Sequence, residues 1–360
     1  MQLHLVGGFL GSGKTTAIIG AVKHLMARGA RVGVVTNDQG RYLVDTAFVA
    51  GARVPTVEVT GGCFCCHYDD LEARLDELER SAMPHVIFAE SVGSCADLVA
   101  TVMKPLVELK RVPTQRTTLS VFTDLRLLKR RLDGKAMPFS DNVVYIFDKQ
   151  IEEAGLLILN KADLLDPDQA QRIAQAARER FPSKIVHLQN SLDGDAITAW
   201  LRLLETQDGS SGGGALEIDY ARYGAGEGKL AWLDQQVRLA APPGRLREAV
   251  VTLMSGLLDG IRERHLPVGH VKFLVRCGAE QVKISSTSGG QDDWRDQVPP
   301  ILGKEATVVV NARVEADASV LVELAREALE QARLRSGARC LELSTDFFHP
   351  GFPRPTHRFN

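Results

Sequence analysis

Short apolar segments alternate with longer amphipathic segments through the N-terminal part of the chain. Several short segments are apolar at nearly every position, which is typical of strands in a parallel sheet covered on both faces. In the longer segments, apolar residues recur with helical spacing. The predicted strands are Gln2–Val6, Arg31–Thr36, Val54–Val59, His85–Glu90, Thr117–Thr123, Leu156–Asn160 and Lys184–Leu188. The predicted helices are Lys14–Arg28, Asp69–Arg80, Asp141–Glu153 and Asp168–Arg180.

This alternation predicts an α/β fold built on a doubly wound, mostly parallel sheet. In such sheets, ligands bind beyond the carboxyl ends of the strands. We therefore look for chemistry in the loops that directly follow the predicted strands.

A polar segment rich in glycine and serine, residues 207–228, interrupts the pattern and is predicted to be a linker. Beyond it, two strand–helix–strand patterns with one extra strand suggest a smaller α+β domain of the split βαβ type. We thus expect domains at 1–206 and 229–345 and an irregular tail at 346–360. The strands predicted here are Lys229–Ala240, His270–Arg276, Gln281–Thr287, Ala306–Val314 and Arg339–Leu343, and the helices are Arg245–Arg264 and Ala318–Arg335.

Composition narrows the function classes. The chain has 360 residues, of which 44% are hydrophobic and 24% charged, which is typical of a folded globular protein. Its net charge of -2 argues against nucleic acid as the main partner. No apolar run is long enough to cross a bilayer, so no membrane partner is expected. A predicted strand begins at Gln2, so we expect no signal peptide and a cytoplasmic location.

The segment after the first predicted strand satisfies the phosphate-loop pattern G-x-x-x-x-G-K-[ST] and leads into the first predicted helix. Its glycines let successive backbone amides point at phosphates, and the helix N-terminus adds partial positive charge. Lys14 would reach the β- and γ-phosphates, and the Thr15 hydroxyl would bind Mg²⁺. The pattern predicts a P-loop NTPase whose nucleotide-binding residues include Gly8, Gly11, Ser12, Gly13, Lys14, Thr15 and Thr16.

The base of the nucleotide is predicted from Asn160-Lys161-Ala162-Asp163, which follows a predicted strand. A carboxylate at Asp163 can accept hydrogen bonds from the ring N–H and the exocyclic amine of guanine, whereas adenine has no matching pair of donors. Leaving a buried carboxylate without partners is costly, so this residue selects strongly. We therefore expect Asn160, Lys161 and Asp163 to bind GTP or GDP.

Two further loops follow strands. Glu90 ends one strand and is expected to hold Mg²⁺ directly or through water, while the amide of Gly93 would contact the γ-phosphate. Together with Lys14, they are the predicted catalytic residues. The loop from Asn37 to Gly40, with Asp45 farther along, is placed to act as a nucleotide-sensing switch.

Cysteines are concentrated after the third predicted strand, in Gly61-Gly62-Cys63-Phe64-Cys65-Cys66. Three thiolates on one loop can converge on Zn²⁺ or a related soft ion. Water, His67 or Asp38 would complete the coordination. A redox-active pair and small buried thiols that pack the glycine turn are the alternatives. The remaining cysteines, Cys95, Cys277 and Cys340, are interpreted as buried thiols.

In this order, the phosphate loop, the cysteine motif, Glu90-Ser91-Val92-Gly93 and the Asn-Lys-Ala-Asp motif resemble the CobW-like family of P-loop GTPases. These GTPases are related to the urease and hydrogenase nickel-insertion GTPases. The segment from Lys149 to Ala154 is similar to that family as well. The resemblance covers roughly residues 1–206 well and the second domain only in outline. The chain departs from the family where Asp38 follows Asn37 in the switch loop, since a glutamate is usual there.

The resemblance implies a GTP-hydrolysing metallochaperone or metalloenzyme activator that binds Zn²⁺ or a related transition metal at Cys63, Cys65 and Cys66. GTP hydrolysis would be slow without a partner, and the C-terminal domain would recognise a client metalloprotein or cofactor-assembly enzyme. The alternatives are a GTPase switch with structural or redox-sensing cysteines and a factor that assembles a corrinoid-type cofactor. The client, the metal and the oligomeric state, a homodimer included, are left open.

Overall fold

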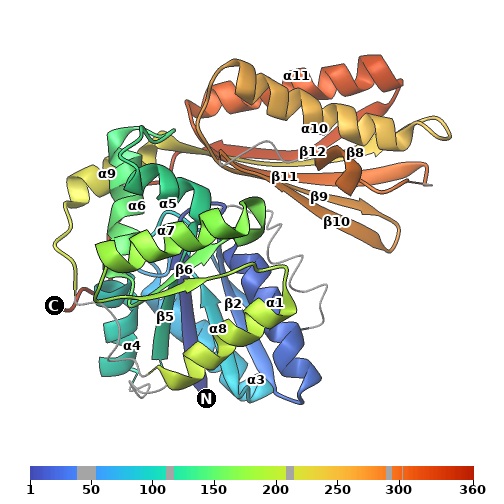
Figure 1. Cartoon of the computed structure of the whole chain (residues 1–360). Coiled ribbons are helices and arrows are strands. Elements are labelled where there is room, and N and C mark those ends of the chain that lie inside the picture. Colours follow the sequence, from blue (N-terminus) through green and yellow to red (C-terminus); the bar gives the residue numbers. More distant parts are fainter. Residues whose placement is uncertain (39–53, 111–116, 208–214, 289–293, 302) are drawn as a thin grey trace. The chain divides into compact units, whose positions relative to one another are not determined.

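The computed structural model describes residues 1–38, 54–110, 117–207, 215–288, 294–301 and 303–360 (Figure 1). Within these ranges the chain forms two compact units. The first contains the described residues of 1–226 together with 353–360, and the second contains those of 227–352.

The first unit is built on a parallel sheet that has seven strands in the part of the chain described, in the order β3-β2-β4-β1-β5-β6-β7. All strands predicted from the sequence before the glycine-rich segment are present, and every strand pair is parallel. The doubly wound α/β prediction is therefore confirmed. The strands are β1 (Gln2–Gly8), β2 (Val32–Asp38), β3 (Thr56–Thr60), β4 (Val86–Glu90), β5 (Thr117–Asp124), β6 (Leu156–Asn160) and β7 (Ile185–Leu188).

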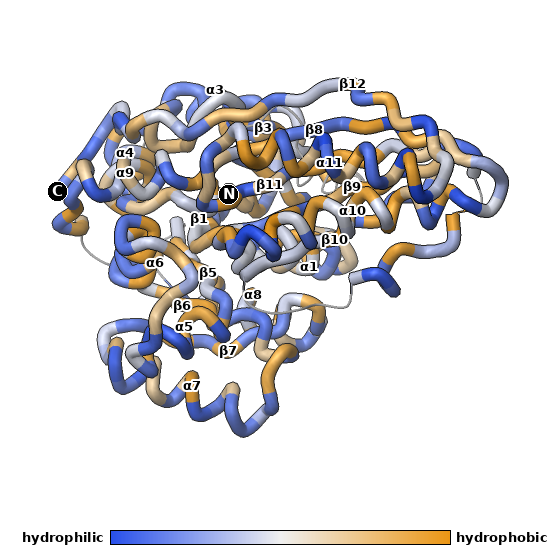
Figure 2. Tube along the Cα trace, turned by 90° about the horizontal axis from the view of Figure 1, so that it is seen from above, coloured by the Kyte–Doolittle hydropathy of each residue, from blue (hydrophilic) through white to orange (hydrophobic). Residues whose placement is uncertain are grey.

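Helices connect these strands, and their polar and apolar positions alternate along the trace, as α7 shows (Figure 2). Asp166 caps α7 and Asp193 caps α8, each accepting hydrogen bonds from two backbone N–H groups of the first turn. The helices are α1 (Lys14–Ala27), α3 (Tyr68–Ala82), α4 (Lys104–Glu108), α5 (Leu125–Leu132), α6 (Asp141–Glu153), α7 (Pro167–Arg180), α8 (Gly194–Thr206) and α9 (Tyr220–Lys229). A π-helical turn covers Val99–Met103 and a 3₁₀ turn covers Ala162–Leu164.

Trp200 of α8 fills the core on one face of the sheet. Its side chain is fully buried, and its ring lies 5.8 Å from that of Phe88 and 5.2 Å from that of Phe122, between centroids. The indole N–H donates to the Ser120 hydroxyl at 3.1 Å, so burial leaves this donor satisfied. The sequence pattern did not predict α8, although its tryptophan is central to the packing.

The second unit confirms the split βαβ prediction. In its described residues, an antiparallel sheet of five strands has the order β10-β9-β11-β8-β12, with β10 as the extra edge strand. The apolar sides of α10 and α11 pack on the sheet through residues such as Leu253, Leu257 and Leu321. The elements are β8 (Leu230–Ala240), α10 (Leu246–Glu263), β9 (Val268–Cys277), β10 (Glu280–Ser286), β11 (Glu305–Glu315), α11 (Ala318–Ser336) and β12 (Arg339–Phe348), with a 3₁₀ turn at Trp294–Gln297.

Part of the predicted linker is ordered. Residues Tyr220–Lys229 form α9, where the buried Tyr223 accepts a hydrogen bond from the Ala96 N–H at 3.2 Å. Gly226 lets this helix approach α6, because a Cβ atom there would lie 2.4 Å from the Asn142 carbonyl oxygen. Glycine therefore serves close packing here rather than flexibility. The predicted irregular tail likewise begins later than expected, since β12 runs to Phe348.

None of the helices that the structure describes is both long enough and apolar enough to cross a membrane.

We expect Trp200→Ala to lower the free energy of unfolding of the first unit by about 3–5 kcal/mol, because it removes a large buried side chain and leaves a cavity. Urea denaturation followed by far-UV circular dichroism measures this. Leu192→Ala is the matched control, since Leu192 is 79% exposed. Equal losses in the two variants would contradict the assigned core.

Candidate nucleotide and metal site

The loops predicted to carry chemistry leave one edge of the parallel sheet. The strand order β3-β2-β4-β1 makes neighbours of the strands that precede the cysteine loop, the switch loop, the Glu90 loop and the phosphate loop. On the other side of β1, the strands β5, β6 and β7 lead to Asp124, the Asn-Lys-Ala-Asp motif and Ser191. The sheet thus places the metal candidates and the guanine candidates on opposite sides of the phosphate loop.

The phosphate loop has the strained backbone that its glycines permit. Gly8, Gly11 and Gly13 have positive φ angles of 122°, 70° and 92°. A Cβ atom on Gly8 would lie 2.0 Å from the Phe122 carbonyl oxygen of the neighbouring strand. The Ser12 hydroxyl is buried without a hydrogen-bond partner among the residues described. An unsatisfied donor in this cradle fits an anionic ligand.

Lys14 and Thr15 start α1 and are both buried. The Lys14 ammonium donates to the Gly8 carbonyl at 2.7 Å, so it lies over the loop that would hold phosphates. The Thr15 hydroxyl donates to Glu90 Oε1 at 2.8 Å. The two oxygen ligands predicted for Mg²⁺ therefore lie side by side, while Thr16 is half-buried in the same turn.

Gly93 lies against the phosphate loop. A Cβ atom there would be 3.0 Å from Leu10 Cα and 2.8 Å from Leu10 Cδ2, so only glycine fits without displacing the loop. Its carbonyl accepts a hydrogen bond from Gln150 Nε2 at 3.1 Å. This position beside the loop suits the predicted contact of the Gly93 amide with a γ-phosphate.

Asn160 joins the guanine motif to the phosphate loop. Its Nδ2 donates to the Ser12 carbonyl at 2.7 Å, and its Oδ1 accepts from the Ser191 hydroxyl at 2.8 Å. A Cβ atom on Gly13 would lie 2.4 Å from Asn160 Nδ2. Ser191 was not predicted, although its position just after the last strand of the sheet would have indicated a place at the binding edge.

Lys161 and Asp163 differ in their surroundings. Lys161 adopts a left-handed backbone with φ 65°, and its ammonium lies 3.1 Å from Asp124 Oδ2. Burial alone would raise the pKa of Asp124, but Arg126 and Lys161 outweigh it and hold that pKa below its usual value. Asp163 is exposed, which leaves its carboxylate accessible to a base.

The cysteine loop brings three sulfur atoms together. The Sγ atoms of Cys63, Cys65 and Cys66 all lie within 4.8 Å of one another. Cys63 and Cys65 are buried and Cys66 is half-buried. The Cys63 carbonyl accepts hydrogen bonds from the N–H groups of Cys66 and His67, at 3.0 Å and 2.9 Å, which closes the turn.

Asn37, at the end of β2, holds this loop in place. Its Nδ2 donates to the carbonyls of Val59 and Gly62, at 3.1 Å and 2.6 Å, and its Oδ1 accepts from the Phe64 N–H at 2.9 Å. The predicted switch loop and the cysteine loop therefore share one side chain. The sequence placed Asn37 in the switch loop but gave no sign of this second role.

The thiols of the cluster compete for negative charge. Hydrogen bonds from the Cys65, Cys66 and Cys95 thiols hold the pKa of Cys63 well below its usual value. Hydrogen bonding to Cys63, with burial, raises the pKa of Cys65 well above normal and that of Cys66 to about 11. Hydrogen bonding within the cluster thus favours a thiolate at Cys63 over one at Cys65. A divalent cation would stabilise further thiolates, so the donor set fits a metal ion.

Residues 353–360 dock on the cysteine loop, within the first unit. The Thr356 N–H donates to the Cys65 carbonyl at 2.8 Å, and the Arg354 N–H donates to Cys66 Sγ at 3.2 Å. Arg358 donates to the buried Asp97 at 2.8 Å. The sequence predicted an irregular tail here, and its final residues, 353–360, are docked on the first unit.

The other candidate ligands are less well placed. His67 lies 3.2 Å from Asp70 and does not join the group of converging ligand atoms among the residues described. The side chain of Asp38 is outside the described part, as are Gln39, Gly40 and Asp45. The tentative assignment of Asp38 as a metal ligand stays a prediction.

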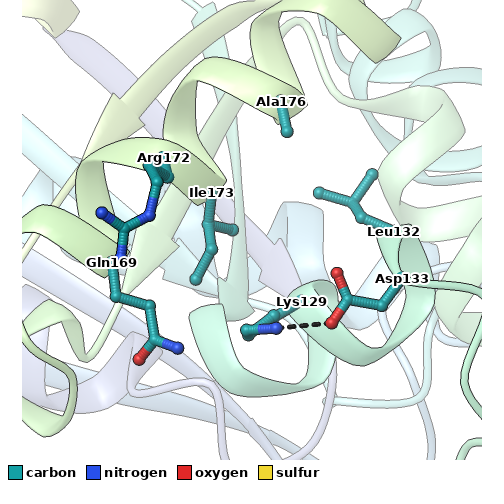
Figure 3. A pocket seen from close by; sticks show the side chains of 7 residues that line it. All are labelled: Lys129, Leu132, Asp133, Gln169, Arg172, Ile173 and Ala176. Carbon is teal, nitrogen blue, oxygen red and sulfur yellow. Dashed lines mark hydrogen bonds and ion pairs between the residues drawn. The ribbon is translucent and has the colours of Figure 1, made fainter.

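A separate hollow lies between α5 and α7, lined by residues that include Lys129, Asp133 and Arg172 (Figure 3). Lys129 and Asp133, which are four residues apart in the chain, form an ion pair at its edge. None of its lining residues belongs to the motifs above, so it carries no part of the predicted chemistry.

Glu153 of α6 is a buried carboxyl behind the Glu90 loop. Its side chain has no exposed surface, and Oε2 accepts from the Val99 N–H at 3.4 Å. Burial, reinforced by the charge of Asp97 and opposed by Lys184, raises the pKa of Glu153 to about 8. The folded chain therefore holds this carboxyl protonated at neutral pH.

Comparison with known proteins places these motifs in context. Residues 2–187 match the family model described as CobW/HypB/UreG, nucleotide-binding domain. The zinc chaperone YeiR of Escherichia coli is 32% identical over 182 residues, which are 48% of this chain and 50% of that protein. The zinc chaperone CobW of Sinorhizobium sp is 25% identical over 206 residues, 50% of this chain and 56% of that protein. The chain thus spans about half the length of these curated relatives.

Among solved structures, HypB from Helicobacter pylori in complex with nickel aligns with a TM-score of 0.42 and 15% identity, over 61% of this chain and 92% of that one. The Zn(II)-bound YjiA GTPase from E. coli aligns with a TM-score of 0.33 and 14% identity, over 90% of this chain and 98% of that one.

We expect the contribution of Glu153 to the free energy of unfolding to fall as pH rises from about 5 to about 8, because a folded-state pKa raised above the unfolded value stabilises only while the group is protonated. Glu153→Gln, which stays neutral, should flatten this dependence. Urea midpoints measured across the range test it, with the exposed neighbour Glu152→Gln as the control. A slope unchanged in Glu153→Gln would refute the assignment.

Proposed function

The chain belongs to the CobW/HypB/UreG family, and from this membership we propose that it is a GTP-hydrolysing zinc metallochaperone. It would bind Zn²⁺ at Cys63, Cys65 and Cys66 and couple metal delivery to the state of its nucleotide. The observation that carries the proposal is the convergence of three thiols on a loop held by Asn37, the first residue of the predicted switch loop.

The phosphate side of the site supports hydrolysis of a nucleoside triphosphate. Lys14 would stabilise charge on the β- and γ-phosphates, and Mg²⁺ held by Thr15 and Glu90 would bridge them. The contact of Thr15 with Glu90 at 2.8 Å supports these roles, and the close approach of Gly93 to Leu10 supports a γ-phosphate contact. Turnover would be slow without a partner.

Guanine is the base that the Asn-Lys-Ala-Asp motif favours. The exposed Asp163 carboxylate would accept the two guanine donors, while Asn160 fixes the motif to the phosphate loop through Ser12. GTP and GDP are thus the proposed ligands.

Zinc is the proposed cargo because three thiolates suit a soft or borderline divalent ion, and because the curated relatives YeiR and CobW are named zinc chaperones. A chaperone needs a recipient, so we propose a client metalloprotein in the cytoplasm, recognised by the second unit. We assign GTP hydrolysis to a domain near residues 1–206 and client recognition to a domain near residues 229–345.

Asp163→Asn should weaken GTP binding by about 1.5–3 kcal/mol, roughly tenfold to a hundredfold, because hydrogen bonds to a charged acceptor are lost. The same variant should bind xanthosine nucleotides better than the wild type does. Fluorescent-nucleotide titrations measure both affinities, and Asp168→Asn, also exposed, is the control. If ATP competes as well as GTP in the wild type, the guanine assignment fails.

Zinc affinity should differ between the GTP-bound and GDP-bound states by roughly fivefold to 150-fold, a coupling of about 1–3 kcal/mol. We expect tighter binding with GTP, since delivery requires release after hydrolysis. Competition with a chromophoric chelator measures this, first with a non-hydrolysable GTP analogue and then with GDP. Replacing Cys63, Cys65 and Cys66 together by serine should abolish the binding.

Equal zinc affinity in both nucleotide states would instead favour a GTPase switch without metal delivery. Stoichiometric zinc retained by the triple variant would mean that the metal binds elsewhere.

A further inference from the structure

Cys95 adjoins the cysteine cluster, although the sequence separates it from the cysteine motif and its Sγ is not among the three converging sulfurs. It follows Gly93 in the loop after β4 and is 1% exposed. Its thiol hydrogen-bonds the thiols of both Cys63 and Cys65. The thiol is buried, as the sequence predicted, but it also contacts two cysteines of the motif.

Three thiolates leave zinc one ligand short of the closed tetrahedral site that it forms in structural centres. With Zn–S bonds of about 2.3 Å, neighbouring sulfurs in such a site lie about 3.8 Å apart. Cys65 Sγ and Cys66 Sγ are 3.8 Å apart, whereas Cys63 Sγ and Cys65 Sγ are 2.9 Å apart and would separate around an ion. The Cys95 thiol contacts both Cys63 and Cys65, the two sulfurs that a bound metal would move apart.

We propose that Cys95 is the fourth sulfur ligand, so that the ion bound at Cys63, Cys65 and Cys66 is enclosed by four thiolates from two loops. This inference rests on the proposed zinc binding and adds the residue that completes the coordination. His67 is turned toward Asp70, at 3.2 Å, and is the weaker candidate for that place.

Hydrogen bonds fix the backbone around Cys95, as a loop that carries a metal ligand requires. Gln150, itself 1% exposed, donates through Nε2 to the carbonyls of Gly93 and Cys95, at 3.1 Å and 2.8 Å. The Cys95 N–H donates to the Val92 carbonyl at 3.0 Å. On the other side of the cluster, the Arg354 N–H donates to Cys66 Sγ, a contact of the kind that stabilises metal thiolates.

The fourth ligand also links the two sites. Gly93 lies against Leu10 of the phosphate loop, and Gln150 ties Gly93 to Cys95. A shift of Gly93 on contact with a γ-phosphate would move Cys95 relative to the other sulfurs. The metal would then have four thiolates in one nucleotide state and three in the other, which provides a route for release.

The test uses the full chain with Co²⁺, whose charge-transfer absorption reports thiolate ligands, and with Zn²⁺ in chelator competition. Cys95→Ser should lose about one of four sulfur contributions to the Co²⁺ spectrum and bind Zn²⁺ at least about tenfold more weakly. Cys277→Ser, which alters a cysteine of the second unit, should match the wild type in both measurements.

A second measurement does not depend on the folding of a variant. X-ray absorption on the zinc-loaded wild type with a bound non-hydrolysable GTP analogue, the state in which we expect tighter zinc binding, should show four sulfur scatterers at about 2.3 Å. Three sulfurs with one nitrogen or oxygen ligand, or a Cys95→Ser spectrum and affinity equal to the wild type, would overturn the role of Cys95 while leaving the proposed function intact. Metal binding that survives replacement of Cys63, Cys65 and Cys66 would overturn both.

Discussion

The parallel backbone pairing of β2 with β3 sets Asn37 opposite Val59, and the cysteine loop is built on that pairing. From this position one amide side chain satisfies two carbonyls and one N–H of the loop. Leaving such buried groups without partners costs about 1–3 kcal/mol each, so the shape of the loop depends on the end of β2. A ligand that shifted the end of β2 would therefore act on the same residue that positions the thiols.

The two halves of the site have opposite electrostatic requirements. Around Lys14 the buried groups include a cation and an unpaired hydroxyl donor on Ser12, which favour an anion. Around Cys63, hydrogen bonds lower the pKa of one thiol and raise that of Cys65, and a bound cation would stabilise both thiolates. Opposite charge preferences in adjacent loops are characteristic of binding sites rather than of cores optimised for stability.

The sequence predicted the parts of the site that lie on single loops. The phosphate loop, Glu90, the Asn-Lys-Ala-Asp motif and the cysteine motif each follow a strand with a recognisable pattern, and the strand order then brings them to one edge. Asn37 and Ser191 act through neighbours on adjacent strands, so their roles depend on strand order. The contact of Cys95 with the cysteine motif was harder to predict, because β3 and β4 are not adjacent and their loops meet across β2. α9 was missed because its glycines resemble a linker, although Gly226 serves close packing.

The docked segment 353–360 follows the whole second unit in the chain yet belongs to the first. Synthesis on the ribosome proceeds from the N-terminus, and domains generally fold as they emerge. The cysteine loop can therefore form early, but the backbone donors of Arg354 and Thr356 reach it only after the second unit has been made. During that interval Cys66 lacks its contact with the Arg354 N–H, so the newly made chain exposes more of this thiol than the finished protein does, where it is half-buried.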